Sequence, residues 1–211
     1  MRAFSILWFG QLVSGLGSAM TRFAFIIWVW QATGEATPLA LIALFSVVPN
    51  VVVSLFAGAV VDRYSRRWIM ILGDLGLTLP TVIRLLLLLS GDLQLWHLYL
   101  AAAVSGLFTP FQSLAFQASV SALVPKDQLT RANGMLSINE YVALVGAPVL
   151  GGLLLTAASL EAVLVFDILT FFVAVGGVLL VRFPGASTTE AQPRASILSD
   201  AVFGFRYIFA R

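Results

Sequence analysis

The sequence predicts an all-α membrane protein with six transmembrane helices. Two bulk properties lead to this fold class: the mean hydropathy is +0.98, and only 10% of the 211 residues are charged. A soluble domain of this length needs a charged surface, which 12 Lys and Arg with 10 Asp and Glu cannot cover. The third observation is the recurrence of apolar segments about 20 residues long, the length that crosses the hydrocarbon core. We therefore expect the lipid bilayer to surround the chain.

Six segments meet this length and composition. Each is expected to be helical, because an unpaired backbone amide in lipid costs several kcal/mol and the alternating pattern of strands is absent. Polar segments with turn residues separate them, among them QATGEATP, DRYSRR, GDLQ and VPKDQLTRAN. The predicted spans are residues 4–30, 39–61, 68–90, 95–118, 134–156 and 162–181.

The positive charges lie on one side of this arrangement. The first, third and fifth loops contain no Lys or Arg, whereas the other side holds every cation outside the spans. By the positive-inside rule, both termini and the second and fourth loops face the cytoplasm of a multi-pass protein in the plasma (inner) membrane. The cations on that side are Arg2, Arg63, Arg66, Arg67, Lys126, Arg131, Arg182, Arg194, Arg206 and Arg211.

Composition argues against several other classes of protein. The net charge is +2 without a basic stripe, so nucleic acid is not an expected partner. The chain has no cysteine, and its one histidine, His97, has no second ligand at metal spacing, so no metal site and no cofactor is expected. Phosphate-binding glycine loops, HExxH helices and GxSxG turns are absent from the sequence. The sequence therefore does not predict an enzyme.

The loop after the second span has a distinctive pattern, GAVVDRYSRRWIM, with Gly58, Asp62, Arg63, Arg66 and Arg67. A small Gly58 lets two helices approach closely, and Asp62 is suited to capping a helix or pairing with an arginine. The arginines are suited to binding carboxylates or anionic lipid. An ordinary cytoplasmic loop would explain the arginines, but not the spacing of the Gly and the Asp. The pattern resembles motif A of the major facilitator superfamily, a motif of the loop between spans two and three.

Two further segments extend this resemblance. The string GLFTPFQSLAFQASVSALVPKDQLTRANG is similar to the fourth span and following loop of the macrolide-efflux and enterobactin-exporter branch of the superfamily. In the fifth span, Gly146, Pro148, Gly151 and Gly152 resemble motif C, which is associated with antiporters. Ala147 stands where the family has a glycine before the proline. A kinked, closely packed span would also be expected to contain these residues.

The resemblance covers the whole chain but half of the usual twelve-span architecture, so it implies the N-terminal half of an exporter. Its six spans would form two inverted three-helix repeats, with the solute bound near the midplane between them. The implied function is secondary active, proton-coupled efflux of a hydrophobic drug, macrolide-like compound or siderophore by alternating access. The implied partners are the bilayer, a small-molecule solute, protons and a second six-span half, either a downstream polypeptide or a second copy.

The resemblance also sets the expected domain boundaries. Residues 1–183 are the six-span unit, 184–195 a cytoplasmic linker, and 196–211 an amphipathic interfacial helix where the second half begins. The chain is accordingly expected to be a fragment, a split gene product or an incomplete gene model.

Polar residues recur at spacings of three to five along the two spans that correspond to each other in inverted repeats. Such spacing places them on one face of each helix, and two matched polar stripes predict a wet surface. The alternative is hydrogen bonding between helices. Phe23, Phe108 and Phe111 are expected to suit a bulky amphipathic or apolar solute. The stripe residues are Gln11, Ser14, Ser18 and Arg22 in the first span, and Ser105, Thr109, Gln112 (or Ser113) and Gln117 in the fourth.

Five ionisable residues lie within the predicted spans, where each costs about 2.5–3.5 kcal/mol and needs a partner or water. Glu140, about 10 Å from the cytoplasmic side, is our candidate for a coupling proton site, with a structural hydrogen bond as the alternative. Asp167 is expected to pair with Arg84, in helices that the family keeps away from the cavity. Asp74 is expected to join Arg63 or Arg67. The five residues are Arg22, Asp74, Arg84, Glu140 and Asp167.

A different class of function also fits six spans, namely a membrane scaffold or partner-binding protein that does not transport. A further six spans in the downstream reading frame would favour the half-transporter. An intramembrane enzyme is the least favoured class, because no nucleophile, base and orienting group occur at matched depth.

Overall fold

The computed structural model describes residues 1–181, and the regular elements in that range are helices. Six helical segments are long and apolar enough to cross a membrane, so the predicted fold class is confirmed for this range. The predicted linker 184–195 and terminal helix 196–211 lie outside the described residues. The segments are α1 (Arg2–Thr33), α2 (Ala36–Arg63), α3 (Arg66–Ser90), α4 (Leu95–Leu123), a fifth span made of η1 (Lys126–Gln128), α5 (Leu129–Tyr141), the π-helical η2 (Val142–Gly146) and α6 (Ala147–Ala157), and α7 (Leu160–Leu180).

The connections are shorter than the sequence predicts. Two residues separate α1 from α2, and two separate α2 from α3, whereas QATGEATP and DRYSRR were expected to form longer turns. Gly34 ends α1 with a φ of 66° and donates its N–H to the carbonyl of Trp30. Glycine adopts this left-handed conformation without a steric penalty. The helices extend into polar sequence because a helix pairs its own backbone groups whether lipid or water surrounds its side chains.

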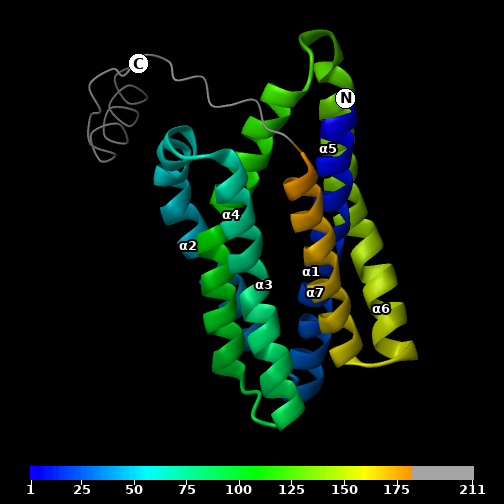
Figure 1. The fold of residues 1–211 in the computed structure, drawn as a ribbon. Helices are drawn as coiled ribbons and strands as arrows, with labels where there is room; N and C mark the ends of the chain where they lie inside the picture. The colour runs from blue at the N-terminus through cyan, green and yellow to red at the C-terminus, as the bar shows by residue number, and fades with distance from the viewer. Residues whose placement is uncertain (182–211) are drawn as a thin grey trace.

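The helices contact one another in a symmetric series. α2 packs on α4, α4 on α3, α3 on α7, α7 on α1, and α1 on α6 (Figure 1). In this series α4 corresponds to α1, α6 to α2, and α7 to α3, so the six spans are two repeats of three. Three crossings separate α1 from α4, and the two helices therefore run in opposite directions. The arrangement is that of two inverted repeats.

Small residues allow the closest helix contacts. A Cβ atom on Gly17 of α1 would overlap the hydroxyl of Thr170 on α7, and one on Gly106 of α4 would overlap the carbonyl oxygen of Ser46 on α2. Lipid tails are as apolar as the helices, so close packing and polar contacts, rather than the hydrophobic effect, hold such helices together.

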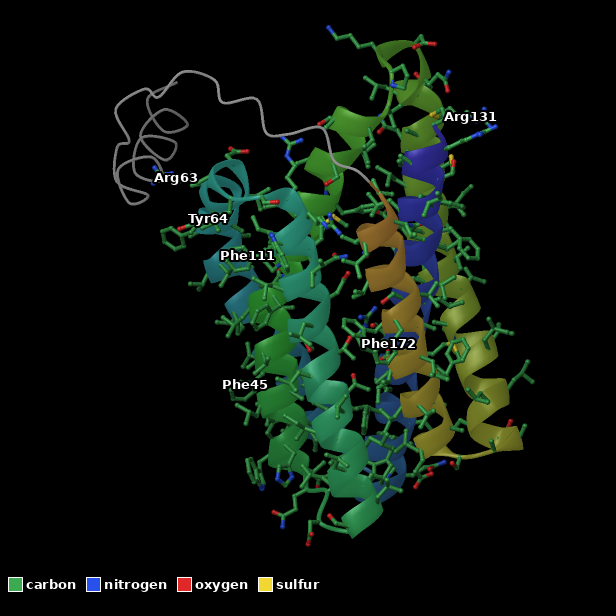
Figure 2. The ribbon with its side chains drawn as sticks, viewed as in Figure 1. Phe45, Arg63, Tyr64, Phe111, Arg131 and Phe172 are labelled. Atoms are coloured by element: carbon green, nitrogen blue, oxygen red, sulfur yellow. The ribbon has the colours of Figure 1, made fainter. Side chains whose placement is uncertain are left out.

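The outward surface of the bundle is apolar along its length. Phe45 and Phe172 are 43% and 63% exposed, and Phe45 lies at the side of the bundle (Figure 2). Arg63 and Arg131 lie on opposite sides of the same end of the molecule, which is the end that the sequence assigns to the cytoplasm (Figure 2). Large exposed apolar side chains along the sides with arginines at one end fit a chain surrounded by lipid.

Candidate substrate cavity

A cavity of about 880 Å³ lies inside the bundle. α1 and α4 form most of its wall, and α2, α3, the fifth span and Asp167 of α7 complete it. All eight stripe residues and Ser113 line this cavity, as does Glu140. The structure therefore brings the predicted substrate-pathway residues together, while their part in handling a solute stays a prediction.

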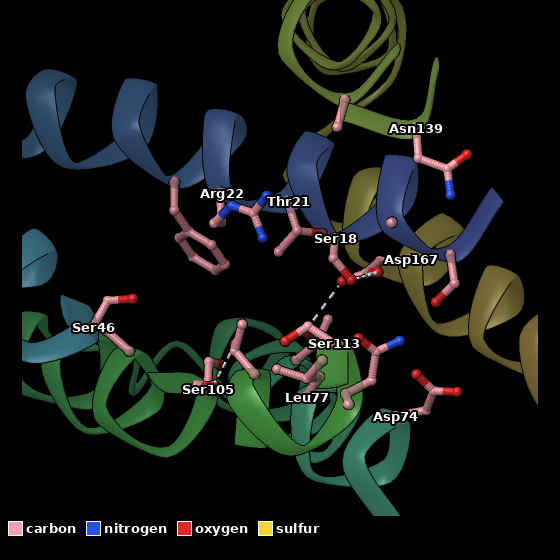
Figure 3. Close-up of a pocket in the computed structure, with 18 of the residues that line it drawn as sticks. Ser18, Thr21, Arg22, Ser46, Asp74, Leu77, Ser105, Ser113, Asn139 and Asp167 are labelled. Carbon is pink, nitrogen blue, oxygen red and sulfur yellow. Dashed lines mark hydrogen bonds between the residues drawn. The ribbon is translucent and has the colours of Figure 1, made fainter. Parts of the chain in front are cut away.

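The two stripes face each other across the cavity. Ser18 and Arg22 of α1 point toward the side formed by Ser105 and Ser113 of α4 (Figure 3). Arg22 is exposed although it lies well inside α1, because its side chain borders the cavity. An arginine at this depth needs water or an anionic partner.

A first group of polar side chains, here called the inner cluster, consists of Asp74, Gln11 and Gln112. Asp74 is 4% exposed. Gln11 Nε2 donates to Asp74 Oδ2 at 3.0 Å, and Gln112 Nε2 donates to Gln11 Oε1. The cluster joins α3, α1 and α4, so the alternative of hydrogen bonding between helices also holds for these two glutamines.

The expected pairing of Asp74 with Arg67 is wrong, whereas the alternative pairing with Arg63 stays a prediction. Asp74 lies seven residues, about 10 Å of helix, beyond Arg67 and faces the cavity, where it accepts its hydrogen bond from Gln11. Arg67 instead donates to the carbonyl oxygen of Leu179 at 3.2 Å.

A second group, the outer cluster, consists of Asp167, Ser18, Thr81 and Arg84. Asp167 is 3% exposed and accepts from Ser18 Oγ at 3.0 Å and from Thr81 Oγ1 at 3.2 Å. Arg84 Nη2 donates to the same Thr81 hydroxyl at 2.9 Å. The guanidinium also lies 4.6 Å from the ring centroid of Phe25, within range of a cation–π interaction.

The sequence predicted that Asp167 meets Arg84, and the structure shows how. Thr81 bridges the two groups, and Arg84 interacts electrostatically with the carboxylate. The further expectation that these residues lie away from the cavity is wrong, because both line it. α3 and α7 meet at the centre of the helix series, so their inner faces reach the cavity between α1 and α4.

Glu140 lies near the end of α5 and is exposed to the cavity. The π-helical η2 follows α5 directly, and Pro148 comes just after η2. A proline removes an N–H from the helix ladder, and π turns are one way in which a helix accommodates such a break. The structure thus places Glu140 where a solute could meet it; its role as a proton site stays a prediction.

The motif A arginines bind backbone carbonyl groups. Arg66 Nη1 donates to the carbonyl oxygen of Ala118 at 2.8 Å, and Arg67 bonds that of Leu179. The expected partners were carboxylates or lipid. Carbonyl groups near the C-terminal end of a helix attract cations, and both acceptors lie toward the C-terminal ends of α4 and α7.

Two other motif A expectations, the close helix approach at Gly58 and the capping role of Asp62, also fail in the described residues, and the pairing of Asp62 with an arginine stays a prediction. A Cβ atom on Gly58 would meet no described atom within 4 Å, so Gly58 does not bring helices together in this part of the chain. Asp62 lies in the last turn of α2, and the residue preceding α3 is Ser65, so Asp62 does not cap α3. Arg63 is the last residue of α2.

The motif C-like glycines pack the fifth span onto α1, as expected of small residues in a close-packed span. A Cβ on Gly151 would lie 3.4 Å from Met20 Cα, and one on Gly152 would lie 3.7 Å from the ring of Phe23. Gly146 is similarly in contact range of α1. The association with antiport stays a prediction.

The aromatic residues of the cavity were predicted incorrectly. The wall contains Phe25 and Phe116 and none of the three predicted phenylalanines. Phe108, for instance, covers Gly76 of α3. The correct pair follows the polar stripes, since Phe25 is three residues after Arg22 and Phe116 is four after Gln112. Helical spacing from the stripe residues thus indicates which phenylalanines line the cavity, whereas closeness in sequence to a stripe residue does not.

Six membrane-spanning helices around a cavity with polar and apolar walls define a multi-pass membrane protein of the transporter class. A family model described as transmembrane secretion effector, within the major facilitator superfamily, matches residues 1–210. The chain belongs to this family.

Curated relatives agree with this assignment. The chain is 29% identical over 181 residues to macrolide efflux protein A of Streptococcus pyogenes, a match that covers 86% of this chain and 45% of the relative. It is 24% identical over 212 residues to the multidrug efflux pump Tap of Mycolicibacterium fortuitum, covering 95% and 51%. It is 26% identical over 164 residues to the enterobactin exporter EntS of Shigella flexneri, covering 72% and 37%. The chain thus spans about half the length of these relatives, which are named for efflux or export and not for an enzymatic reaction.

Proposed function

We propose that this chain forms one half of a secondary active exporter that moves a hydrophobic drug, macrolide-like compound or siderophore out of the cell. A second six-span half would complete the solute pathway, and both termini would face the cytoplasm of the plasma (inner) membrane. The observation that supports this best is the cavity of about 880 Å³ lined by the polar stripes of α1 and α4. A volume of this size suits a large organic solute.

The chemistry of the cavity wall favours an amphipathic solute. Polar groups such as Gln117 and Arg22 share the wall with Phe25, Ile26 and Leu77. A few polar groups among apolar side chains orient a ligand while its apolar surface supplies most of the contact area. The names of the three relatives, which include macrolides and enterobactin, are consistent with large solutes of this kind.

Proton coupling is assigned to Glu140. Within residues 1–181 it is the one carboxylate of the cavity wall with an exposed side chain, so both a solute and water from an open side can reach it. Binding a proton and binding a solute at neighbouring positions links the two equilibria, which an antiporter requires.

An efflux assay tests this proposal. Cells that produce the chain, alone and together with the polypeptide encoded directly downstream, are loaded with a macrolide antibiotic or enterobactin, and the retained compound is measured with and without a protonophore. We expect lower retention in one of the two forms and loss of that effect with the protonophore. No reduction for any compound in either form would favour the non-transporting scaffold.

Two variants test the roles proposed for Glu140 and Arg22. Glu140→Gln should abolish proton-driven efflux while its amount in the membrane stays unchanged, and Arg22→Ala should reduce export without affecting insertion. Glu35→Gln, which removes a carboxylate from the loop between α1 and α2, is the matched control and should export normally. Unchanged transport by Glu140→Gln would remove the proton assignment, and normal export by Arg22→Ala would leave Arg22 a structural role.

A further inference from the structure

The buried carboxylate of Asp74 differs from its counterpart in the other repeat. Asp74 lies about 12 Å from the start of α3, and Asp167 lies about 11 Å from the start of α7, the corresponding helix. The two repeats therefore place one aspartate each at the same depth from opposite membrane surfaces. Both are nearly inaccessible, at 4% and 3% exposure.

The surroundings of the two carboxylates are not the same. Asp167 interacts electrostatically with Arg84 and with Arg22. Asp74 is held by uncharged amides, directly by Gln11 and through it by Gln112. The other charged groups that face this cavity are Arg22 from α1, Arg84 from α3 itself, Glu140 from α5 and Asp167 from α7, and α2 and α4 contribute none within the described residues.

A buried charge without a counterion is costly, and a carboxylate has a simple way to avoid that cost, which is to bind a proton. We infer that Asp74 is a second proton-binding site of this chain, connected to the solute cavity through the side chains of Gln11 and Gln112. A proton from the aqueous side adds to one carboxylate oxygen, and no other bond forms or breaks. Its role in transport rests on the proposed function, whereas proton binding itself does not.

The hydrogen-bond directions show what the proton would change. The ionised carboxylate accepts from Gln11, which in turn accepts from Gln112 on the opposite wall. A protonated Asp74 becomes a donor, and it bonds best to the carbonyl oxygen of Gln11, the atom that now accepts from Gln112. The Gln11 amide now presents its Nε2 to Asp74, so it must rotate to present this oxygen, and the rotation moves the acceptor of Gln112. Proton uptake at α3 thereby alters a contact between α1 and α4, the two helices that line most of the cavity.

Infrared difference spectroscopy of the 211-residue chain in lipid nanodiscs tests this inference without any solute. Lowering the pH should produce the C=O stretching band of a protonated buried carboxyl group. Asp74→Asn, which is isosteric and keeps an acceptor for Gln11, should lose that band, while Glu140→Gln should retain it. An identical band in Asp74→Asn, or a band lost only in Glu140→Gln, would overturn the inference.

A second variant keeps the test decisive if Asp74→Asn does not fold. Gln11→Leu leaves Asp74 in place but removes the group bonded to it, so the frequency of the Asp74 band should shift. A band of unchanged frequency in Gln11→Leu would also overturn the inference. The outcome is separable from the proposed function: a confirmed band without any efflux contradicts transport alone, and proton-driven efflux without this band contradicts the Asp74 site alone.

Discussion

The inner and outer clusters hold the same acidic residue at matched depth and differ in what surrounds it. In the outer cluster Asp167 accepts from two hydroxyl groups, and one of them, on Thr81, also bonds to Arg84. In the inner cluster Asp74 has amide partners. The first arrangement places a cation near the carboxylate, which favours its ionised form, and the second supplies only uncharged partners among the described residues. Inverted repeats can therefore share a backbone plan while one keeps a structural ion network and the other a titratable group.

The comparison requires that the two clusters lie toward opposite membrane surfaces. Cysteine labelling from each side of the membrane tests this orientation and should give the largest effect. The chain has no cysteine, so single cysteines can be introduced without removing any. With a membrane-impermeant thiol reagent, Glu35→Cys should label in intact cells, and Ser65→Cys should label only after permeabilisation. Labelling of Ser65→Cys in intact cells would reverse the assignment of inside and outside.

Removing each carboxylate should reveal the difference in stability. Asp167→Asn leaves the guanidinium of Arg84 in the bundle without its counterion, and should lower the free energy of unfolding by about 3 kcal/mol. Asp74→Asn breaks no ion interaction and should change it by less than about 1 kcal/mol. Reversible unfolding in mixed micelles, followed by circular dichroism, measures both. Equal losses would mean that the two clusters do not differ in the proposed way.

The helix contact beside the outer cluster should tolerate no added volume. A methyl group on Gly17 would overlap Thr170 and approach the backbone of Asp167, so Gly17→Ala should destabilise the chain by about 2 kcal/mol. A methyl group on Gly15, in the same helix, would have no other described atom within 4 Å, and Gly15→Ala is the control expected to cost nothing. Similar unfolding curves for the two variants would contradict the α1–α7 contact.

The smallest effect should come from one donor of the outer cluster. Ser18→Ala removes a hydrogen bond to Asp167 and should cost about 1 kcal/mol, a usual magnitude for such bonds in membrane proteins. Ser14 lies one turn away in the same stripe, so Ser14→Ala should leave the unfolding curve unchanged. A loss in Ser14→Ala as large as in Ser18→Ala would show that the stripe as a whole, and not the bond to Asp167, supports stability.

Much of this organisation can be predicted from the sequence because the relevant signals are local. Hydropathy over about 20 residues indicates the six spans, and three- and four-residue spacing indicates the polar faces of α1 and α4. The helix ends were less predictable, since polar residues do not end a helix by themselves. In α4 the helix continues to Leu123, five residues past the predicted boundary, and in the fifth span helical structure begins at Lys126 rather than near Gly134.

Partner choice could not be predicted, because it depends on depth and on neighbouring helices. The spacing along α3 does not show that Asp74 meets Gln11 of α1 rather than the arginines of its own helix. Thr81 was missed for a similar reason, since a single threonine in an apolar helix gives no sign that it bridges Asp167 and Arg84. Coupling ion, solute and direction of transport stay predictions.

The π turn in the fifth span has a consequence for how that span is drawn as a helical wheel. Glu140 and Gly151 are eleven residues apart, about three full turns of an uninterrupted α-helix, and would then share one azimuth. The extra residue of the π turn offsets them by about 100°. Gly151 can therefore lie against Met20 while Glu140 looks into the cavity. Deleting one residue between Val142 and Gly146 would place Glu140 and Gly151 on the same side of the helix again. Glu140 would then rotate out of the cavity wall.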